Sequence, residues 1–385
     1  MSLRDYCSND RQREVFDAVE AADGNMAAAA RNLGNNPRTV TRMMGRLEKR
    51  AARRGYSPKH GMTNTVPEGF HVKGVSTLYD EDGNVKIKWV KTNAEKDAAV
   101  QAILDVVEEY EAPAIPKIKR TTKTIDDLCT LYTITDFHLG AYAYAKETGD
   151  DWDTDLAEKV LINAFTDLMS GSPDSELAIF AQLGDFLHWD GMDAVTPTSG
   201  HLLDADTRFS KLVELAIDVC VRVIGMLLTK HKKVHVIMAE GNHDMASSVW
   251  MQKLMRKLFA DNPRVTIDDS EFPFYAMQHG NVMLGFHHGH KVKNQSLPTL
   301  FASEPRFRKM WGDSIYTYIH TGHYHHTEQT MSETGGAIVE RHPTLAGRDA
   351  YAARGGYVSW RAARAITYHK EYGESYRVSK VPRAA

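Results

Sequence analysis

The sequence predicts an α/β protein that follows a small helical unit. From Leu128 onward, short apolar runs alternate with longer amphipathic segments, which is the pattern of a strand-and-helix fold. Five of the apolar runs lead directly into blocks rich in Asp, Asn, His and Gly. Before residue 60, three helical patterns with a basic stripe stand apart from this alternation. Because open α/β sheets place their functional groups at strand ends, the five blocks are the candidate site.

The strands and helices of the alternating region follow from their spacing. The runs expected as strands are short and rich in apolar and aromatic residues, and the expected helices carry apolar residues at helical intervals. We expect strands at residues 131–135, 177–183, 234–239, 282–286 and 316–320. We expect helices at residues 155–169, 207–228 and 248–259.

The composition is that of a globular protein with more than one domain. The chain has 385 residues, of which 42% are hydrophobic and 25% are charged, so we expect two or three domains. No run approaches about 18 apolar residues, and no signal-peptide core is present, which predicts no membrane partner. The three cysteines are far apart, which indicates a reducing compartment. We therefore expect a cytoplasmic protein; its oligomeric state stays open.

Residues 1–58 predict a small helical domain. Helices are expected at about 11–22 and 26–33, and a third begins at Pro37 with Asn36 as its N-cap. Helix, short turn and basic helix resemble a helix-turn-helix module, and the alternative is a solvated charged face on a small bundle. Nucleic-acid contacts are expected from an i, i+4 stripe of arginines: Arg38, Arg42, Arg46 and Arg50.

Residues 59–124 connect this domain to the remainder of the chain. A hairpin is expected from residues 75–79 and 85–90, and a helix from residues 94–110. Residues 111–123 hold two prolines and four cations without amphipathic period, which is typical of a linker. The sequence does not decide which neighbour the hairpin packs on. The last domain is expected at residues 125–385.

The five polar blocks carry ligands that suit divalent transition metals. Asp136 and His138 are two residues apart, so both project to the same side of a strand end. Carboxylate with imidazole suits Mn²⁺, Fe, Zn²⁺ or Ni²⁺ better than Mg²⁺ or Ca²⁺. Two such ions about 3.5–4 Å apart would share a hydroxide and hold a phosphate for attack. The expected metal ligands are Asp136, His138, Asp185, Asn242, His288, His323 and His325.

Catalytic roles beyond the metals are expected for two further residues. His243 adjoins a ligand, and an imidazole can protonate the leaving oxygen of a phosphate ester. Asp244 is expected to orient that ring. His188 either contacts substrate or caps the loop at 189–206, which we expect to shape substrate access. Neither a Gly-x-Ser-x-Gly motif nor a P-loop is present, so no protein nucleophile is indicated.

The five blocks, in this order, resemble the calcineurin-like metallophosphoesterase superfamily. The resemblance implies a two-sheet, four-layer α-β-β-α sandwich with two metals, one held by Asp136, His138, Asp185 and His325. It implies that Asp185, Asn242, His288 and His323 hold the other metal, and that His243 is the acid. His288 is preferred to His287 as the ligand because it precedes a glycine.

Smaller details of the blocks bear on the substrate. The stretches around Asp136 and Asp185 resemble the nuclease subunit of double-strand-break repair complexes. The protein Ser/Thr phosphatases of the superfamily carry Asp-Arg after their Gly-Asp block, where this chain has His188-Trp189. A dedicated phosphoprotein phosphatase is therefore disfavoured. The combination with a helix-turn-helix and a hairpin is similar to proteins of tailed bacteriophages or prophages, which would place the chain in a bacterial host cytoplasm.

Three functions follow from these features. The leading hypothesis is a Mn²⁺-dependent nuclease or phosphodiesterase that acts on DNA or RNA. The alternative keeps the site but assigns it a cyclic or small nucleotide, with the N-terminal module as a regulatory or partner-binding domain. The third is a DNA-binding regulator with a vestigial site, which the completeness of the ligand set disfavours.

Overall fold

A computed structural model describes most of the chain. The described residues are 2–7, 9–63, 66, 70–80, 82, 85–94, 103, 104, 106, 107, 110, 123–197, 199–325 and 331–382. The chain divides into two compact units, Met1–Gln101 and Ala102–Ala385. None of the helices in the described part combines the length and the apolar character that a membrane crossing needs.

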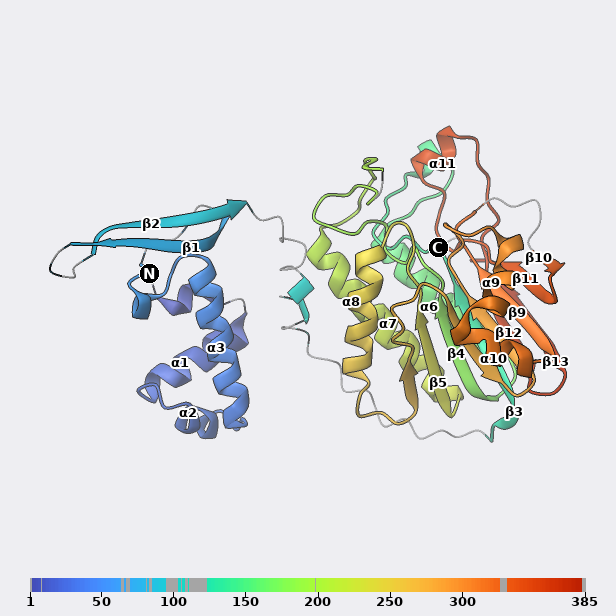
Figure 1. The fold of residues 1–385 in the computed structure, drawn as a ribbon, viewed down its shortest axis with the longest axis horizontal. Helices are drawn as coiled ribbons and strands as arrows, with labels where there is room; N and C mark the ends of the chain where they lie inside the picture. The colour runs from blue at the N-terminus through green and yellow to red at the C-terminus, as the bar shows by residue number, and fades with distance from the viewer. Residues whose placement is uncertain are drawn as a thin grey trace. The chain divides into compact units, whose positions relative to one another are not determined.

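The N-terminal unit contains the three helices that the sequence predicts (Figure 1). They are α1 (Asp10–Ala21), α2 (Met26–Asn32) and α3 (Pro37–Arg53), after the 3-10 helix η1 (Leu3–Tyr6). An asparagine precedes each α-helix and accepts a backbone N–H in its first turn, which satisfies a donor that the helix leaves open. Their buried faces form one core: Val15, Phe16, Val19, Ala29, Ala30, Val40, Met44 and Leu47.

The arginine stripe on α3 does not form one exposed row. Arg38 and Arg42 are exposed, whereas Nη1 of Arg50 donates to the carbonyl of Tyr6 at 3.2 Å and to Oε1 of Gln12 at 3.1 Å. Four-residue steps advance about 40° around a helix, so the stripe turns about 120° between Arg38 and Arg50. Arg50 therefore contributes to the packing of α3 on η1 and α1, and its role as a nucleic-acid contact stays a prediction.

The predicted hairpin belongs to the N-terminal unit. Its strands β1 (Phe70–Tyr79) and β2 (Val85–Ala94) pair antiparallel, with Val75 opposite Val90. After the 3-10 helix η2 (Pro58–His60), Nζ of Lys88 donates to the carbonyl of Gly61 at 2.7 Å, which ties the hairpin to the end of the helical part. The predicted helix at 94–110 and the predicted linker at 111–123 lie largely outside the described residues.

The larger unit is built on two β-sheets. One has six strands in the order β13-β12-β3-β4-β5-β6, and the other has five in the order β10-β11-β9-β8-β7. The first comprises β3 (Ile125–Ile134), β4 (Ser175–Gln182), β5 (Lys233–Met238), β6 (Val265–Ile267), β12 (Ala363–His369) and β13 (Gly373–Lys380). The second comprises β7 (Tyr275–His279), β8 (Val282–Phe286), β9 (Tyr316–Thr321), β10 (Met331–Thr334) and β11 (Ala337–Arg341).

Helices cover the outer faces of both sheets (Figure 1). On the six-stranded sheet lie α6 (Thr154–Gly171), α7 (Phe209–Lys230) and α8 (Met245–Leu258). On the five-stranded sheet lie α9 (Leu297–Ser303), which follows η3 (Asn294–Ser296), and α10 (Pro305–Asp313). The short helices α5 (Ala145–Thr148) and α11 (Ala350–Arg354) contact each other. The unit is thus mixed α/β with two sheets flanked by helices, as the sequence predicts.

The main core lies between the two sheets. Alternation along β8 sends Leu284 and Phe286 inward against Ile366, while Met283 faces outward to Phe301 of α9. The predicted strands at β3, β4, β5, β8 and β9 are confirmed, and so are the predicted helices α6, α7 and α8. Two buried faces on one strand explain why these segments are almost wholly apolar and easy to recognise.

The C-terminal strands were not predicted. The tail after Arg341 supplies β12 and β13, and β12 pairs antiparallel with β3, with Arg364 opposite Thr133. Arginines in these strands interrupt the apolar alternation that marks a strand. Arg364 and Arg377 each place Nη1 2.5 Å from Oε1 of Glu340, which is only 2% exposed, so the charges are paired inside the fold.

We predict that Glu340→Ala destabilises the larger unit. The substitution leaves two arginines without their buried partner, which lowers the free energy of unfolding by about 3–5 kcal/mol at pH 7 in urea titrations. The matched control Glu333→Ala changes an exposed carboxylate on β10 and costs less than about 0.5 kcal/mol. Equal losses in both variants would contradict this assignment.

The same carboxylate predicts how stability depends on pH. Burial raises the pKa of Glu340, but His342, Arg377 and His320 outweigh burial and hold this pKa below its ordinary value. A depressed folded-state pKa contributes stability above the unfolded pKa of about 4.3, and the contribution is lost as the pH falls through the folded value. The difference between the wild type and Glu340→Ala should therefore shrink in acid.

Candidate metal centre

The five polar blocks meet at the carboxyl ends of strands from both sheets. β3, β4 and β5 are mutually parallel, and β8 is parallel to β9. The loop after each strand carries ligands of the candidate site, and parallel strands present these loops at one edge. Each of these strands is followed by one or two candidate ligands: Asp136 and His138 after β3, Asp185 after β4, Asn242 after β5, His288 after β8, and His323 and His325 after β9.

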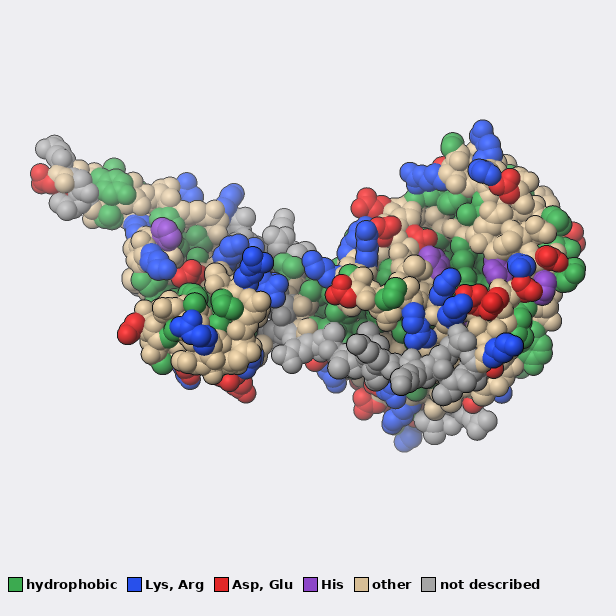
Figure 2. Space-filling view, turned by 90° about the horizontal axis from the view of Figure 1, so that it is seen from below, with side chains coloured by type: hydrophobic (Ala, Val, Ile, Leu, Met, Phe, Trp, Pro, Cys, Tyr) green, Lys and Arg blue, Asp and Glu red, His purple; other side chains and the backbone are tan. Residues whose placement is uncertain are grey.

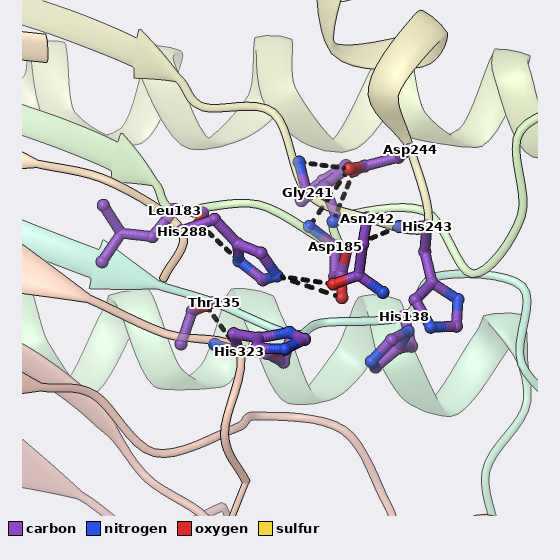
Figure 3. Close-up of polar contacts among 12 residues, drawn as sticks. Thr135, His138, Leu183, Asp185, Gly241, Asn242, His243, Asp244, His288 and His323 are labelled. Atoms are coloured by element: carbon purple, nitrogen blue, oxygen red, sulfur yellow. Dashed lines mark hydrogen bonds and ion pairs between the residues drawn. The ribbon is translucent and has the colours of Figure 1, made fainter. Parts of the chain in front are cut away.

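One set of ligands joins the two sheets. Asp136, Asp185, His288 and His323 each offer an atom, and these atoms lie within 4.8 Å of one another. Nε2 of His288 is 3.2 Å from Oδ2 of Asp185 and 3.2 Å from Oδ1 of Asn242 (Figure 3). Two carboxylates, two imidazoles and an amide oxygen therefore converge, which is a mixed O/N set suited to a transition metal.

A second set overlaps the first. Ligand atoms of Asp136, His138 and His325 lie within 4.8 Å of one another, with Nε2 of His325 at 3.1 Å from Oδ1 of Asp136. Asp136 is the carboxylate common to both sets, whereas the resemblance assigned this role to Asp185. Oδ1 of Asp185 instead accepts the backbone N–H of His243 at 2.8 Å. The sequence reasoning named every member of both sets.

Backbone strain is concentrated at these ligands. Asp136, His138, Asp185 and His323 have φ values of 50°, 46°, 52° and 71°. Such left-handed conformations cost about 1–3 kcal/mol each for residues other than glycine. Within the described part of the chain, only Asp23 shares this property among non-glycine residues. Strained backbone conformations of this kind persist only where the surrounding structure imposes them, and they are most common at functional sites.

Two glycines of the motifs are required by close packing. Gly184 has φ = 105°, and a Cβ at this position would lie 2.5 Å from Nδ1 of His288. A Cβ at Gly241 would collide with the carboxylate of Asp185. Any side chain at either position would push a ligand out of place, so these glycines let two loops approach each other beside the site.

The charges at the site are those of a cation-binding centre. Burial raises the pKa of Asp185, but His288 outweighs burial and holds it well below its ordinary value. Burial lowers the pKa of His288, but the charge of Asp185 outweighs burial and raises it to about 9. In the same way, His325 outweighs burial and holds the pKa of Asp136 below its ordinary value. The charge of Asp136 in turn raises the pKa of His325. Both carboxylates therefore stay ionised although they are buried.

The hydrogen bonds of His288 test whether a metal fits. Its Nδ1–H donates to the carbonyl of Leu183 at 2.9 Å, and its Nε2 faces oxygens of Asp185 and Asn242. A divalent cation bound by Nε2 would meet the same oxygens. Metal-binding histidines usually donate their other N–H to a backbone carbonyl in this way. The donor set therefore fits a divalent metal.

His243 and His188 stand beside the second set (Figure 3 shows His243 next to His138). The rings of His138 and His243 are 4.8 Å apart, and Nδ1 of His188 is 3.3 Å from Nδ1 of His138. Nδ1–H of His243 donates to the carbonyl of His188 at 2.8 Å. This bond fixes the ring of His243 and directs its other nitrogen away from the loop that carries His188.

Asp244 has a different role from the one expected. Its carboxylate accepts N–H groups from Gly241 and from Asp185, Phe186 and Leu187, at 2.7–3.1 Å (Figure 3). Burial, and then the charge of Asp185, raises the pKa of Asp244 to about 7. The side chain thus braces the loop that carries Asp185, and the ring of His243 is oriented by His188.

Other histidines lie outside the ligand sets. Nδ1–H of His287 donates to the carbonyl of Pro273 at 3.0 Å, so His288 and not His287 reaches the carboxylates. His320, Glu340 and His342 also lie close enough to hold an ion. Their nitrogens are already used, because Tyr368 donates to His320, His320 to His342, and His342 to Thr133. That group is a buried hydrogen-bond chain.

Two threonines that the sequence analysis missed support Asp136. Oγ1 of Thr135 donates to Oδ2 of Asp136 at 2.5 Å, and Oγ1 of Thr344 donates to its carbonyl at 2.7 Å. Thr135 adjoins a motif, but Thr344 is more than 200 positions away in the chain. A single sequence holds no signal that links Thr344 to this site.

A cavity of about 90 Å³ opens beside His138, His188 and His325. The side chain of His325 is 35% exposed, so the site communicates with solvent. Figure 2 shows histidine side chains at the surface of the larger unit, among side chains of both charges. The far wall of the cavity comes from residues 344–361. Ala205, near the end of the loop at 189–206, pairs with Ala141, which lines the cavity.

Comparisons with known proteins give similarity at low scores only. No family model and no curated protein matches the chain. Among solved structures, it is similar to Vacuolar Protein Sorting 29 from Cryptosporidium parvum, with 15% identity and a TM-score of 0.29 over 66% of this chain and 98% of that one. A predicted phosphoesterase from Streptococcus pneumoniae has 10% identity and a TM-score of 0.26 over the same shares.

A third similar structure is Phosphopantetheinyl Hydrolase from Mycobacterium tuberculosis. The identity is 11% and the TM-score 0.27, over 60% of this chain and 93% of that one. TM-scores in this range do not assign a fold family or a function. The functional conclusion therefore rests on the geometry of the site.

We predict that the metal affinity of the site rises with pH. The pKa of His288 is about 9 without metal, so a bound cation displaces at least one proton below that pH. The apparent affinity for Mn²⁺ should rise about tenfold per pH unit from pH 7 toward 9, measured by calorimetry in buffers of different ionisation heat.

His287→Gln is the matched control for this titration. Burial lowers the pKa of His287 to about 4, so it holds no proton to release in this range, and the slope should be unchanged. A flat affinity between pH 7 and 9 in the wild type would show that His288 does not face the bound ion.

Proposed function

We propose that the chain is a metal-dependent phosphoric ester hydrolase of the calcineurin-like metallophosphoesterase superfamily. The observation that carries the proposal is the pair of overlapping ligand sets, joined by Asp136, at the carboxyl ends of strands from two sheets. Two carboxylates and several imidazoles at this spacing can hold two divalent cations, and paired cations are the usual means of hydrolysing phosphate esters without a protein nucleophile.

The residues that hold the cations follow from the two sets. Asp136, Asp185, Asn242, His288 and His323 would hold one ion, and Asp136, His138 and His325 the other. When bound, the ions lower the pKa of water and neutralise charge on the phosphate; Mn²⁺ is favoured by the mixed ligands, with Fe, Zn²⁺ or Ni²⁺ as the alternatives.

The chain itself contributes proton transfer and positioning. His243 is held through Nδ1 by the carbonyl of His188, so a proton at Nε2 can pass to the leaving oxygen. His188 lines the cavity and contacts His138, which supports a role for His188 as a substrate contact. Asp244 keeps the Asp185 loop in place through its four amide hydrogen bonds.

We propose nucleic acid as the substrate, with a nuclease or phosphodiester activity on DNA or RNA. In support, the N-terminal unit packs three helices in the order of a helix-turn-helix, and its third helix exposes Arg38 and Arg42. Exposed arginines on such a helix attract phosphate backbones. A substrate panel of DNA, RNA, cyclic nucleotides and an aryl phosphodiester, with Mn²⁺ and with chelator, is the direct test.

One observation favours a second candidate. The cavity beside His325 is small, about 90 Å³, which suits a cyclic or small nucleotide as well as one unit of a polymer. Under this candidate, the N-terminal unit binds a partner or regulates the enzyme. Turnover of cyclic nucleotides together with inertness toward every polymer in the panel would select it.

We predict that His243→Ala slows the cleavage of nucleic acid much more than the cleavage of an aryl phosphodiester. Cleavage of nucleic acid should fall about 10²–10⁴-fold in kcat, because an alkoxide leaves poorly without a proton. An aryl phosphodiester, whose phenolate leaves readily, should lose far less. The comparison uses steady-state rates with Mn²⁺.

His369→Ala is the control for that substitution. His369 ends β12 opposite Leu128, at the far end of the sheet from the metal ligands, and its loss should change neither rate. Asp185→Asn should abolish turnover of both substrates, because it removes a ligand. An equal loss on both substrates in His243→Ala would assign His243 to metal binding or folding instead of proton transfer.

We predict that Arg38→Ala with Arg42→Ala weakens only polymer cleavage. The KM for DNA should rise, and the dependence of log KM on log salt should flatten by about one unit for each lost phosphate contact. The aryl ester should be unaffected. Lys309→Ala, an exposed lysine on α10, is the control. An unchanged KM for DNA would favour a partner-binding role for the N-terminal unit.

A further inference from the structure

Exposed aromatic side chains occur in the segment that forms one wall of the cavity beside the candidate ligands. Tyr351 and Trp360 are 78% and 71% exposed, and Tyr357 is 50% exposed. They belong to the segment 344–361, whose residues form the far wall of the cavity. Large apolar surfaces that gather at one place on a protein mark an interaction site. We call these three side chains the aromatic rim.

The rim is held close to the cavity by specific contacts. Nη2 of Arg354, at the end of α11, lies 2.8 Å from Oε1 of Glu147 in α5. The backbone N–H of Arg348 donates to Oδ2 of Asp150 at 3.2 Å. The guanidinium of Arg361, the residue after Trp360, lies 5.2 Å from the centre of the Trp152 ring. Trp152 is buried, so the segment is anchored to the body of the unit on both sides of the rim.

Two further exposed aromatic residues adjoin the cavity in sequence. Tyr142 and Tyr144 are both exposed, and they precede α5, which contacts α11. Ala141, beside Tyr142, lines the cavity together with Ser359, beside Trp360. Exposed aromatic residues therefore adjoin lining residues in two separate segments of the chain.

The charge of the segment complements a phosphate chain. Residues 342–362 contain three arginines, Arg348, Arg354 and Arg361, against one acid, Asp349. Nη2 of Arg348 donates to the carbonyls of Ala352 and Ala353, which orient the guanidinium without neutralising it. Arg348 and Arg361 line the cavity together with Asp150 and Asp349, and Nη1 of Arg361 lies 3.8 Å from Oδ1 of Asp150. Arg348 is therefore the lining cation that can meet a phosphate, beside a segment rich in exposed aromatic residues.

We infer that the rim binds single-stranded nucleic acid, with unpaired bases on the aromatic faces and phosphates drawn toward Arg348. The inference rests on the proposed phosphodiesterase function and names its substrate class. Aromatic platforms beside a cationic groove are how proteins bind unpaired strands, at about 1–3 kcal/mol per stacked base. In a duplex the faces of the bases are covered by their neighbours, so the rim selects strands or ends that are unpaired.

The geometry of the rim suits stacking in particular. The rings of Tyr351 and Tyr357 are 6.4 Å apart with 26° between their planes, so they form a nearly parallel pair. The ring of Tyr357 packs where a Cβ on Gly355 would otherwise lie, and the glycine therefore allows this ring position.

The test measures binding without turnover. The full-length chain is titrated with a labelled oligothymidylate of about twelve nucleotides, and with a duplex of the same length, in chelator. Tyr351→Ala and Trp360→Ala should each weaken binding of the single strand about tenfold, as measured by fluorescence anisotropy, and should leave duplex binding within about twofold. Trp360→Phe, which keeps an aromatic face, should recover most of the loss.

Tyr372→Ala is the matched control. Tyr372 is 70% exposed, as Trp360 is, but it lies in the turn between β12 and β13, at the other end of the sheet. Its loss should leave both titrations unchanged. Unaltered single-strand binding in the two rim variants would overturn the inference, and so would an equal loss for duplex and single strand. Either result would leave a protein partner as the occupant of the rim.

A second measurement separates this inference from the proposed function. With Mn²⁺, the rim variants should hydrolyse an aryl phosphodiester as fast as the wild type and an oligonucleotide with a raised KM. If the wild type hydrolyses the aryl ester but no oligonucleotide, the nuclease proposal fails, while the anisotropy still decides whether the rim binds single strands. If the oligonucleotide is cleaved equally by all variants, the rim inference fails and the nuclease proposal stands.

Discussion

The structure depends on keeping two buried carboxylates ionised at the edge of two sheets. Asp136 and Asp185 are almost fully buried, a position in which an isolated carboxylate would take up a proton. Each is instead paired with an imidazole, His325 or His288, from a loop of the other sheet. The pairing ties the two sheets together at the point where their loops meet. It also brings together a cluster of charged groups that can bind a cation.

Much of the surrounding structure serves to hold those groups in strained positions. The left-handed backbone at Asp136 and Asp185 aims their side chains into the gap between the sheets, and amide hydrogen bonds to Asp244 keep the second loop from relaxing. Gly184 and Gly241 let the loops approach without a side chain between them. The strain and the close approach are parts of one arrangement, because neither loop could move without displacing a ligand.

The two compact units carry different candidate functional groups. The larger unit carries the ligands, the cavity and the aromatic rim, while the smaller one carries the exposed arginines of α3. Under the proposed function, hydrolysis at phosphorus needs mainly positioning and charge from the protein. We propose that the arginines of α3 and the aromatic rim then select the substrate.

The sequence by itself determined the central strands, the long helices and the members of the candidate ligand sets. β3, β4, β5, β8 and β9 are largely buried, so apolar and aromatic residues dominate their sequences, and each is followed by a polar block. Periodicity likewise identified α1 to α3, since their caps and core faces are local features. Only the tertiary structure decided the remainder. Arg50 donates to Tyr6 because the helix turns its side chain toward η1, and Asp244 accepts backbone amides that lie more than 50 positions away. β12 pairs with β3, and its Arg364 forms an ion pair with Glu340 on β11 of the other sheet. These outcomes depend on contacts between segments that are distant in the sequence, and local sequence patterns do not predict such contacts.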